Sequence, residues 1–113
     1  MCTENQLAKI LSFVALQTRT VLTEKLDCMI LFGSYARGDY DDESDIDIMI
    51  LADIDSDEVN NYTRKIYDKL YESEFDTDCV LSLCIVPQER FYRFKETLPF
   101  YRNVEREGIK IAV

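Results

Sequence analysis

The 113-residue sequence contains no histidine and no tryptophan, and only three glycines and two prolines. Glycine and proline are too scarce for a collagen-like repeat, a Pro-rich linker or a low-complexity segment. No apolar run approaches the roughly 20 residues of a membrane span. Residues 3–6 also lack the basic and apolar segments that begin a secretory signal peptide. We therefore expect a soluble, cytoplasmic protein with no membrane partner.

The four cysteines include no Cys-x-x-Cys pair. Without histidine as well, a zinc site of the usual ligand spacing is excluded. Three of the cysteines, Cys28, Cys79 and Cys84, lie in apolar stretches, where a free cysteine behaves as a small core residue. The pattern predicts a reducing compartment, with no disulfide framework.

The composition is that of a folded protein, with 47% hydrophobic and 12% aromatic residues. A chain of this size buries roughly two thirds of its unfolded surface when it folds. We expect one domain over residues 1–113, with a hydrophobic core that needs no metal or disulfide.

The net charge of −9 is unevenly distributed along the chain. Ten of the 22 acidic residues, and none of the 13 basic ones, lie between Asp39 and Glu58. The rest of the chain is close to neutral, so the sequence predicts one local negative field, which attracts cations. The alternative is a solvated acidic loop. Basic residues near the C-terminus alternate with glutamates, which indicates a mixed solvated surface and no direct nucleic-acid binding.

Hydrophobic periodicity predicts a protein of mixed α and β structure. The expected elements are a helix over 4–24, strands over 28–32 and 46–51, a helix from a cap at Asp55 or Ser56 to near Glu74, a strand over 79–86, a helix that begins at Pro87 and ends before Leu98, and a last helix from Pro99 with Gly108 as its C-cap.

Gly33 and Ser34 follow the first strand, where Ser34 can begin a helical turn. Backbone N–H groups at the start of a helix point outward and can hold a phosphate. The Ser34 hydroxyl and the Arg37 guanidinium can add further bonds to the same anion. A plain Gly-Ser turn is the alternative reading.

Ten residues separate Ser34 from Asp45, and Asp47 follows two residues later. This spacing places both carboxylates on one face of a strand. Two neighbouring carboxylates repel each other unless a cation lies between them. Mg²⁺ bound by a few carboxylates and substrate phosphates fits this chemistry, and a strand end that faces water is the alternative.

The segments GSYARG and SDIDIMI together resemble the Gly-Ser, ten residues, Asp-x-Asp signature of the polymerase-beta-like nucleotidyltransferases. The similarity is to their minimal free-standing members, the MNT domains, and residues 99–111 look like the tail of many small members. The resemblance implies a nucleotidyltransferase fold of the α/β (α+β) class, with a small mixed sheet flanked by helices. It also implies two Mg²⁺ ions on Asp45 and Asp47, and ATP phosphates bound by Gly33 and Ser34, with Arg37 as a further candidate.

The family pattern also includes a third carboxylate on the next strand. Asp78 is the favoured candidate for the third catalytic and metal-binding position, and Asp76 is the alternative. Both residues can equally belong to a solvated turn. Without a third ligand, the protein would bind a nucleotide but turn it over poorly.

The resemblance implies transfer of AMP from ATP to a hydroxyl of a partner. Fewer than thirty residues follow the third predicted strand, so we expect a separate molecule to supply the acceptor. The leading hypothesis is an antitoxin that modifies a tyrosine of an HEPN-type toxin, while another protein or a small molecule stays open as acceptor. The alternative is a weakly active or inactive module that neutralises its partner by masking it. An acidic scaffold that binds no nucleotide is a third possibility.

Overall fold

The computed structural model describes residues 3–73 and 79–112. Its helices and strands follow one another in the order that the periodicity predicts, with one additional short strand near the C-terminus. In chain order they are α1 (Glu4–Leu22), the 3-10 turn η1 (Thr23–Lys25), β1 (Leu26–Phe32), α2 (Ser34–Arg37), β2 (Ile46–Ala52), the 3-10 turn η2 (Ser56–Glu58), α3 (Val59–Glu72), β3 (Leu81–Pro87), α4 (Gln88–Phe94), α5 (Pro99–Glu107) and β4 (Ile109–Ile111).

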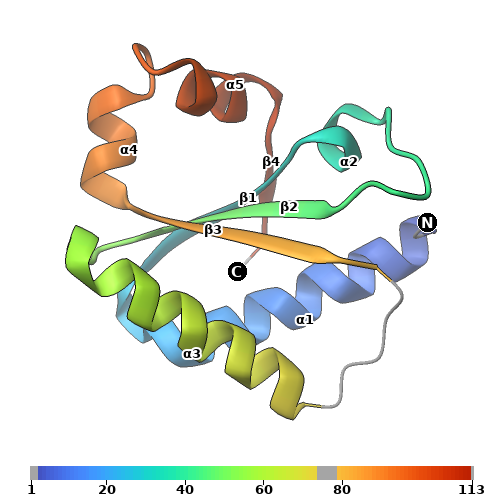
Figure 1. The fold of residues 1–113 in the computed structure, drawn as a ribbon, viewed down its shortest axis with the longest axis horizontal. Coiled ribbons are helices and arrows are strands. Elements are labelled where there is room, and N and C mark those ends of the chain that lie inside the picture. The colour runs from blue at the N-terminus through green and yellow to red at the C-terminus, as the bar shows by residue number, and fades with distance from the viewer. Residues whose placement is uncertain (1–2, 74–78, 113) are drawn as a thin grey trace.

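The four strands form one mixed sheet in the order β3-β2-β1-β4 (Figure 1). β1 runs antiparallel to β2 and β4, whereas β2 and β3 run parallel. The parallel pair requires a crossover, and α3 provides it. The prediction of a small mixed sheet flanked by helices is confirmed.

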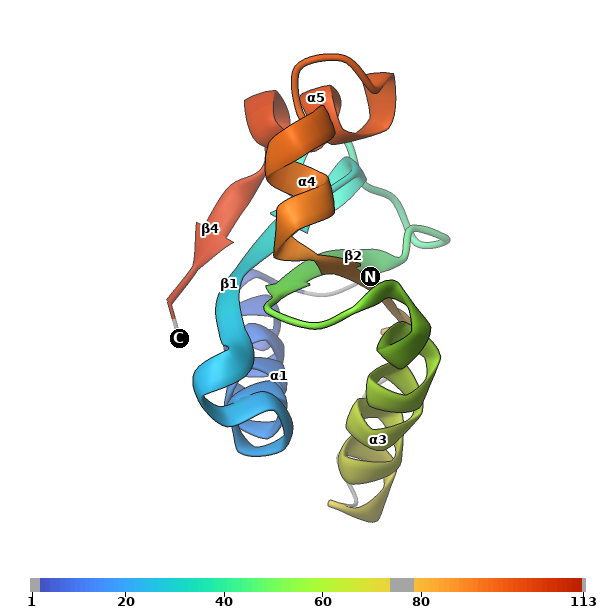
Figure 2. The ribbon, with the colours of Figure 1, turned by 90° about the vertical axis from the view of Figure 1, so that its left-hand side faces the viewer.

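Helices cover both faces of the sheet: α1 and α3 lie on one face, and α4 and α5 on the other (Figures 1 and 2). Successive side chains of a strand point to opposite faces. On β2, Ile46, Ile48 and Ile50 therefore join the core beneath α1 and α3. Met49 and Leu51 join a second core with α4 and α5. By the same alternation, Asp47 lies on the face that carries α4 and α5.

The helix α1 begins at its expected cap, whereas the cap at Asp55 begins the 3-10 turn η2, which leads directly into α3. Thr3 and Gln6 form a capping box at the start of α1, and Asp55 and Glu58 form another just before α3. A cap of this kind stabilises a helix start by about 1 kcal/mol. α1 ends at Leu22, two residues before the expected boundary, and none of the described helices is long and apolar enough to cross a membrane.

Several sequence-based expectations differ from the structure. The strand β4 was not predicted, because three residues are too few to show a period. Pro87 ends β3 and occupies the N-cap position of α4, although we expected it in the first turn of the helix. Cys28 and Cys84 are free thiols as expected, but Cys79 is disulfide-bonded.

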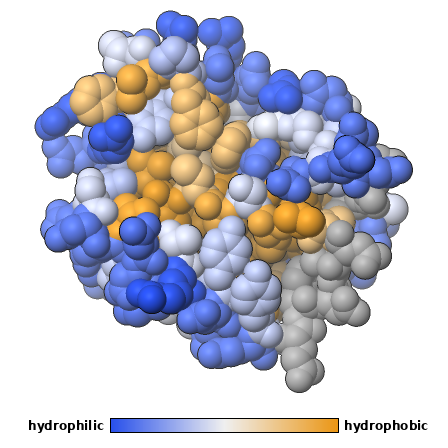
Figure 3. All heavy atoms as spheres, viewed as in Figure 1, coloured by the Kyte–Doolittle hydropathy of each residue, from blue (hydrophilic) through white to orange (hydrophobic). Residues whose placement is uncertain are grey.

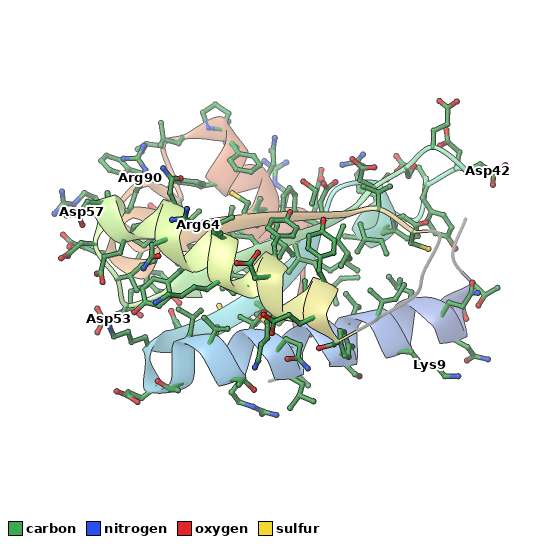
Figure 4. All side chains as sticks on the ribbon, turned by 60° about the horizontal axis from the view of Figure 1, so that its bottom comes forward. Lys9, Asp42, Asp53, Asp57, Arg64 and Arg90 are labelled. Atoms are coloured by element: carbon green, nitrogen blue, oxygen red, sulfur yellow. The ribbon has the colours of Figure 1, made fainter. Side chains whose placement is uncertain are left out.

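The acidic stretch from Asp39 to Glu58 does not form the single local field that the sequence predicted. The buried strand β2 divides it, and seven residues of strand span roughly 20 Å. Asp42 consequently lies at one end of the molecule, with Asp53 and Asp57 at the opposite end (Figure 4). Only the acids near Asp45 remain beside the Gly33–Ser34 turn.

β3 is an edge strand, and its outer side faces away from β2. Hydrophobic side chains gather across the middle of this side of the molecule, over β3 (Figure 3). The strand edge is partly protected, because the Leu83 N–H donates a hydrogen bond of 2.9 Å to the Tyr67 hydroxyl of α3. Pro87, at the end of the strand, has no N–H to offer a further strand.

Replacing Tyr67 with Phe removes the hydroxyl that the Leu83 N–H requires. We expect Tyr67→Phe to lower the free energy of unfolding by about 1 kcal/mol, measured by urea titration. Tyr71→Phe is the matched control, because Tyr71 stacks on Tyr67 but is 76% exposed. Equal stability of the two variants would contradict a structural role for the Tyr67 hydroxyl.

Candidate active site

The Gly33–Ser34 turn connects the end of β1 to the short helix α2. Gly33 has φ +75° and ψ −156°, a backbone conformation that is essentially restricted to glycine. Its carbonyl oxygen accepts hydrogen bonds of 3.1 Å from the N–H groups of Ala36 and Arg37. The chain thus turns sharply into a helix start, as the sequence predicted, and Ser34 is its first residue.

Gly33 lies directly against the side chain of Asp47. A Cβ atom at position 33 would overlap the Asp47 Oδ2 atom and would lie 3.2 Å from its Cγ. The two segments meet because Phe32, next to Gly33, is the register partner of Asp47 in the antiparallel β1–β2 pair. The tertiary structure therefore brings the Gly-Ser turn and the Asp-x-Asp segment into contact.

The two carboxylates differ in their surroundings. Asp45 precedes β2 and is exposed, whereas Asp47 is half-buried within the strand. Burial, followed by the negative charge of Asp45, raises the pKa of Asp47 above its ordinary value. A hydrogen bond from the Ser82 hydroxyl and the charge of Arg37 act in the opposite direction. The charges of Asp45 and Arg37 therefore both act on Asp47.

The predicted third ligands, Asp78 and Asp76, lie outside the described residues. In the β2–β3 register, Ser82 pairs with Asp47, and the Val80 carbonyl accepts the N–H of Ile46. The side chain beside Asp47 on β3 therefore carries a hydroxyl group instead of a carboxylate. The sequence analysis gave Ser82 no role, because only the register shows that it lies beside Asp47.

Arg37 extends from α2 toward acidic partners. Its Nε lies 3.2 Å from Asp39 Oδ2, and its Nη1 lies 3.6 Å from Glu107 Oε2 on α5. These ion pairs keep the guanidinium beside the turn, although its side chain is 44% exposed. The link to α5 was not foreseen, because the two residues are far apart in the sequence.

A second acidic group lies at the opposite end of β2. Within residues 3–73 and 79–112, oxygen atoms of Asp55, Asp57 and Glu58 lie within 4.8 Å of one another. Asp55 and Glu58 already form the capping box before α3. This group is therefore explained by helix capping, and it lies beyond the opposite end of β2 from Asp45 and Asp47.

The residues around Asp47 suit a magnesium–nucleotide complex. Asp45 and Asp47 supply hard oxygen ligands, and their repulsion favours a cation between them. At Gly33 the missing Cβ lets the backbone lie close to this carboxylate. A phosphate bound at the turn would therefore lie close to Asp47.

Residues 18–111 match the family model described as a nucleotidyltransferase domain. The match covers more than half of the chain, so the chain belongs to the nucleotidyltransferase family. A protein of Methanocaldococcus jannaschii, provisionally named protein adenylyltransferase, is 44% identical over 80 residues, or 71% of this chain and 72% of the relative. A second protein of that organism with the same provisional name is 70% identical over 33 residues, or 29% of this chain and 33% of the relative.

A solved structure has the same architecture. The crystal structure of a protein from Sulfolobus solfataricus, provisionally named nucleotidyltransferase, has a TM-score of 0.56 and 18% identity. It covers 91% of this chain and 77% of its own, and at this identity the likeness shows the fold alone. A toxin–antitoxin structure with AMP-PNP is similar at a TM-score of 0.49 and 22% identity, over 87% of this chain and 69% of its own.

Replacing Gly33 with Ala combines an unfavourable backbone conformation with the overlap on Asp47. We expect Gly33→Ala to lower the free energy of unfolding by about 2–5 kcal/mol in urea titrations. Gly38→Ala is the matched control, because Gly38 also has a positive φ of +88° but its Cβ would meet no atom within 4 Å. The control should lose only about 1–2 kcal/mol. Equal losses would rule out the close contact with Asp47.

Replacing Asp47 with Asn should stabilise the metal-free protein at pH 7. The folded-state pKa of Asp47 is raised, so its ionisation opposes folding once the pH exceeds the ordinary value of 3.8. The advantage of Asp47→Asn should therefore shrink as the pH falls toward 4, as measured by urea unfolding in EDTA. Asp53→Asn, an equal charge change at an exposed position, is the control. A destabilised Asp47→Asn variant at pH 7 would contradict the repulsion.

Proposed function

We propose that the protein transfers a nucleoside monophosphate, AMP from ATP, to a hydroxyl of a partner protein. The observation that carries this proposal is the contact between the Gly33 turn and the Asp47 carboxylate. This contact brings a candidate phosphate-binding turn next to two candidate metal-binding carboxylates, in a chain of the nucleotidyltransferase family. The oxygen of the acceptor hydroxyl would bond to the α phosphorus as pyrophosphate leaves, and the hydroxyl proton would pass to solvent.

Each site residue has a separate part in this proposal. Gly33 and Ser34 would hold the β and γ phosphates through backbone N–H groups and the Ser34 hydroxyl. Arg37 would add positive charge beside them, where Asp39 and Glu107 hold its guanidinium. Asp45 and Asp47 would bind Mg²⁺, two ions being expected, with Asp78 as the candidate for a third carboxylate. When bound, Mg²⁺ lowers the pKa of the attacking hydroxyl and neutralises charge on the phosphates.

The site leaves the acceptor side open, because Asp45 is exposed and β3 next to it is an edge strand. The provisional name of the Methanocaldococcus relative, protein adenylyltransferase, supports a protein acceptor. We propose an HEPN-type toxin as the partner and the cytoplasm as the location, on the resemblance of the Gly33–Asp47 signature to that of MNT antitoxins. In this role the chain would inactivate the toxin by covalent modification.

The residue that β3 places beside Asp47 is Ser82, and its chemistry bears on the rate of catalysis. A serine beside Asp47 can orient the carboxylate through its hydrogen bond, but it carries no charge to bind a second ion. If no other carboxylate completes the site, turnover would be slow. A binding role, in which the chain masks the partner, is the second candidate, and the hydrophobic side chains over β3 favour it (Figure 3).

Incubation with α-labelled ATP, Mg²⁺ and the candidate toxin tests both roles. We expect label on the toxin with the wild-type chain, and at least about a 100-fold lower rate with Asp45→Asn or Asp47→Asn. Asp53→Asn should transfer label normally, and EDTA should abolish transfer.

Neutralisation of the toxin is scored in the same samples. If the Asp45→Asn chain neutralises the toxin without labelling it, the protein acts by masking. Unchanged labelling of the toxin by Asp45→Asn and by Asp47→Asn would refute the proposed site.

A further inference from the structure

A pocket of about 240 Å³ opens beside the Gly33 turn. It lies between the end of β1, α2 and the outward face of α5, and the residues used below are Phe32, Gly33, Arg37, Phe100, Asn103 and Glu107. Nothing in the proposed roles of Asp45, Asp47 and Ser34 accounts for the side chains that α5 contributes.

The pocket adjoins the proposed metal site. Gly33 lies in its wall and also contacts the Asp47 carboxylate. Phe32 lies in the same wall and is the register partner of Asp47. A ligand whose phosphates occupy the turn can therefore extend into this pocket without leaving the face of the sheet that carries Asp47.

The lining offers an aromatic surface and a hydrogen-bonding amide. Phe100 packs edge-on against Phe32 with ring centroids 5.6 Å apart, and it remains 47% exposed. An exposed ring fixed in this way provides a surface on which a flat base can stack. The exposed Asn103, one helical turn further along α5, carries both a donor and an acceptor, the pattern that pairs with the N6 and N7 atoms of adenine.

The lining carries one charge of each sign, on Arg37 and Glu107, and these two residues form an ion pair. The Glu107 carboxylate can also accept hydrogen bonds from ribose hydroxyls. The 3.6 Å ion pair with Arg37 holds Glu107 at the boundary between the pocket and the turn. The pocket is smaller than typical sites for drug-sized ligands, so it suits a nucleoside whose phosphates lie outside.

We infer that this pocket binds the adenosine portion of ATP, with the base stacked on Phe100 and its edge bonded to Asn103. This inference rests on the proposed function, because it extends the same nucleotide site. It makes α5 the element that determines base preference, while the Gly33 turn and the two aspartates bind any triphosphate.

Calorimetric titration with ATP, CTP and inorganic tripolyphosphate in Mg²⁺ tests the inference. Loss of base stacking should weaken ATP binding to Phe100→Ala about tenfold, with tripolyphosphate binding unchanged. Phe100→Tyr retains a ring and should bind ATP as the wild type does. Asn103→Ala should reduce the preference for ATP over CTP by about tenfold. Tyr71→Ala, which removes an exposed ring elsewhere, should change neither affinity.

The outcomes separate this inference from the proposed function. If Phe100→Ala and Asn103→Ala both bind ATP as tightly as the wild type, the nucleoside pocket alone would be overturned. The nucleoside pocket would also be overturned if Phe100→Ala lost affinity for ATP and for tripolyphosphate to the same extent, or if Phe100→Tyr lost affinity for ATP. Failure of the wild-type chain to bind either ligand would overturn the proposed function and this inference together.

Discussion

The site depends on the close approach of the Gly33 backbone to the Asp47 side chain. The contact is possible only because position 33 carries no Cβ and tolerates a positive φ. The β1–β2 register fixes it, since Phe32 and Asp47 are paired residues. A shift of this register by one residue would turn Asp47 to the face that packs on α1 and α3. The same pairing that builds the sheet therefore assembles the site.

The electrostatics of the site are unfavourable without a ligand. The pKa of Asp47 is raised by burial and by Asp45, which means that its charge is only partly compensated by Ser82 and Arg37. A cation bound there would relieve this repulsion, and its binding would then add to the stability of the fold. Unfavourable interactions of this kind are common at binding sites, where residues are selected for function at some cost in stability.

The two faces of the sheet differ in how completely they are buried. The face with α1 and α3 is a closed core, in which Ile46, Ile48 and Ile66 are completely buried. The face with α4 and α5 has its own small core, but toward the end of β1 it opens into the pocket beside Gly33. Because α5 returns the chain to β1 through β4, residues from the C-terminal segment reach a turn near position 33.

The sequence alone determined the local structure and the signature residues. Helical and strand periods, the Thr3 cap and the acids near Asp55 were sufficient to predict the main helices and three of the strands, because these signals depend on neighbouring residues. Gly33, Asp45 and Asp47 could be selected as candidate site residues because their chemistry and spacing are specific. The sequence could not reveal that β2 splits the acidic stretch between two ends of the molecule.

Tertiary structure decided the rest, because pairing between distant segments leaves no short-range pattern. The three-residue strand β4 exists only through its pairing with β1. Ser82 lies beside Asp47 because of the parallel β2–β3 register, and Glu107 reaches Arg37 because α5 packs near β1. In each case the two residues are far apart in the chain, and only the packing of the sheet and its helices determines that they meet.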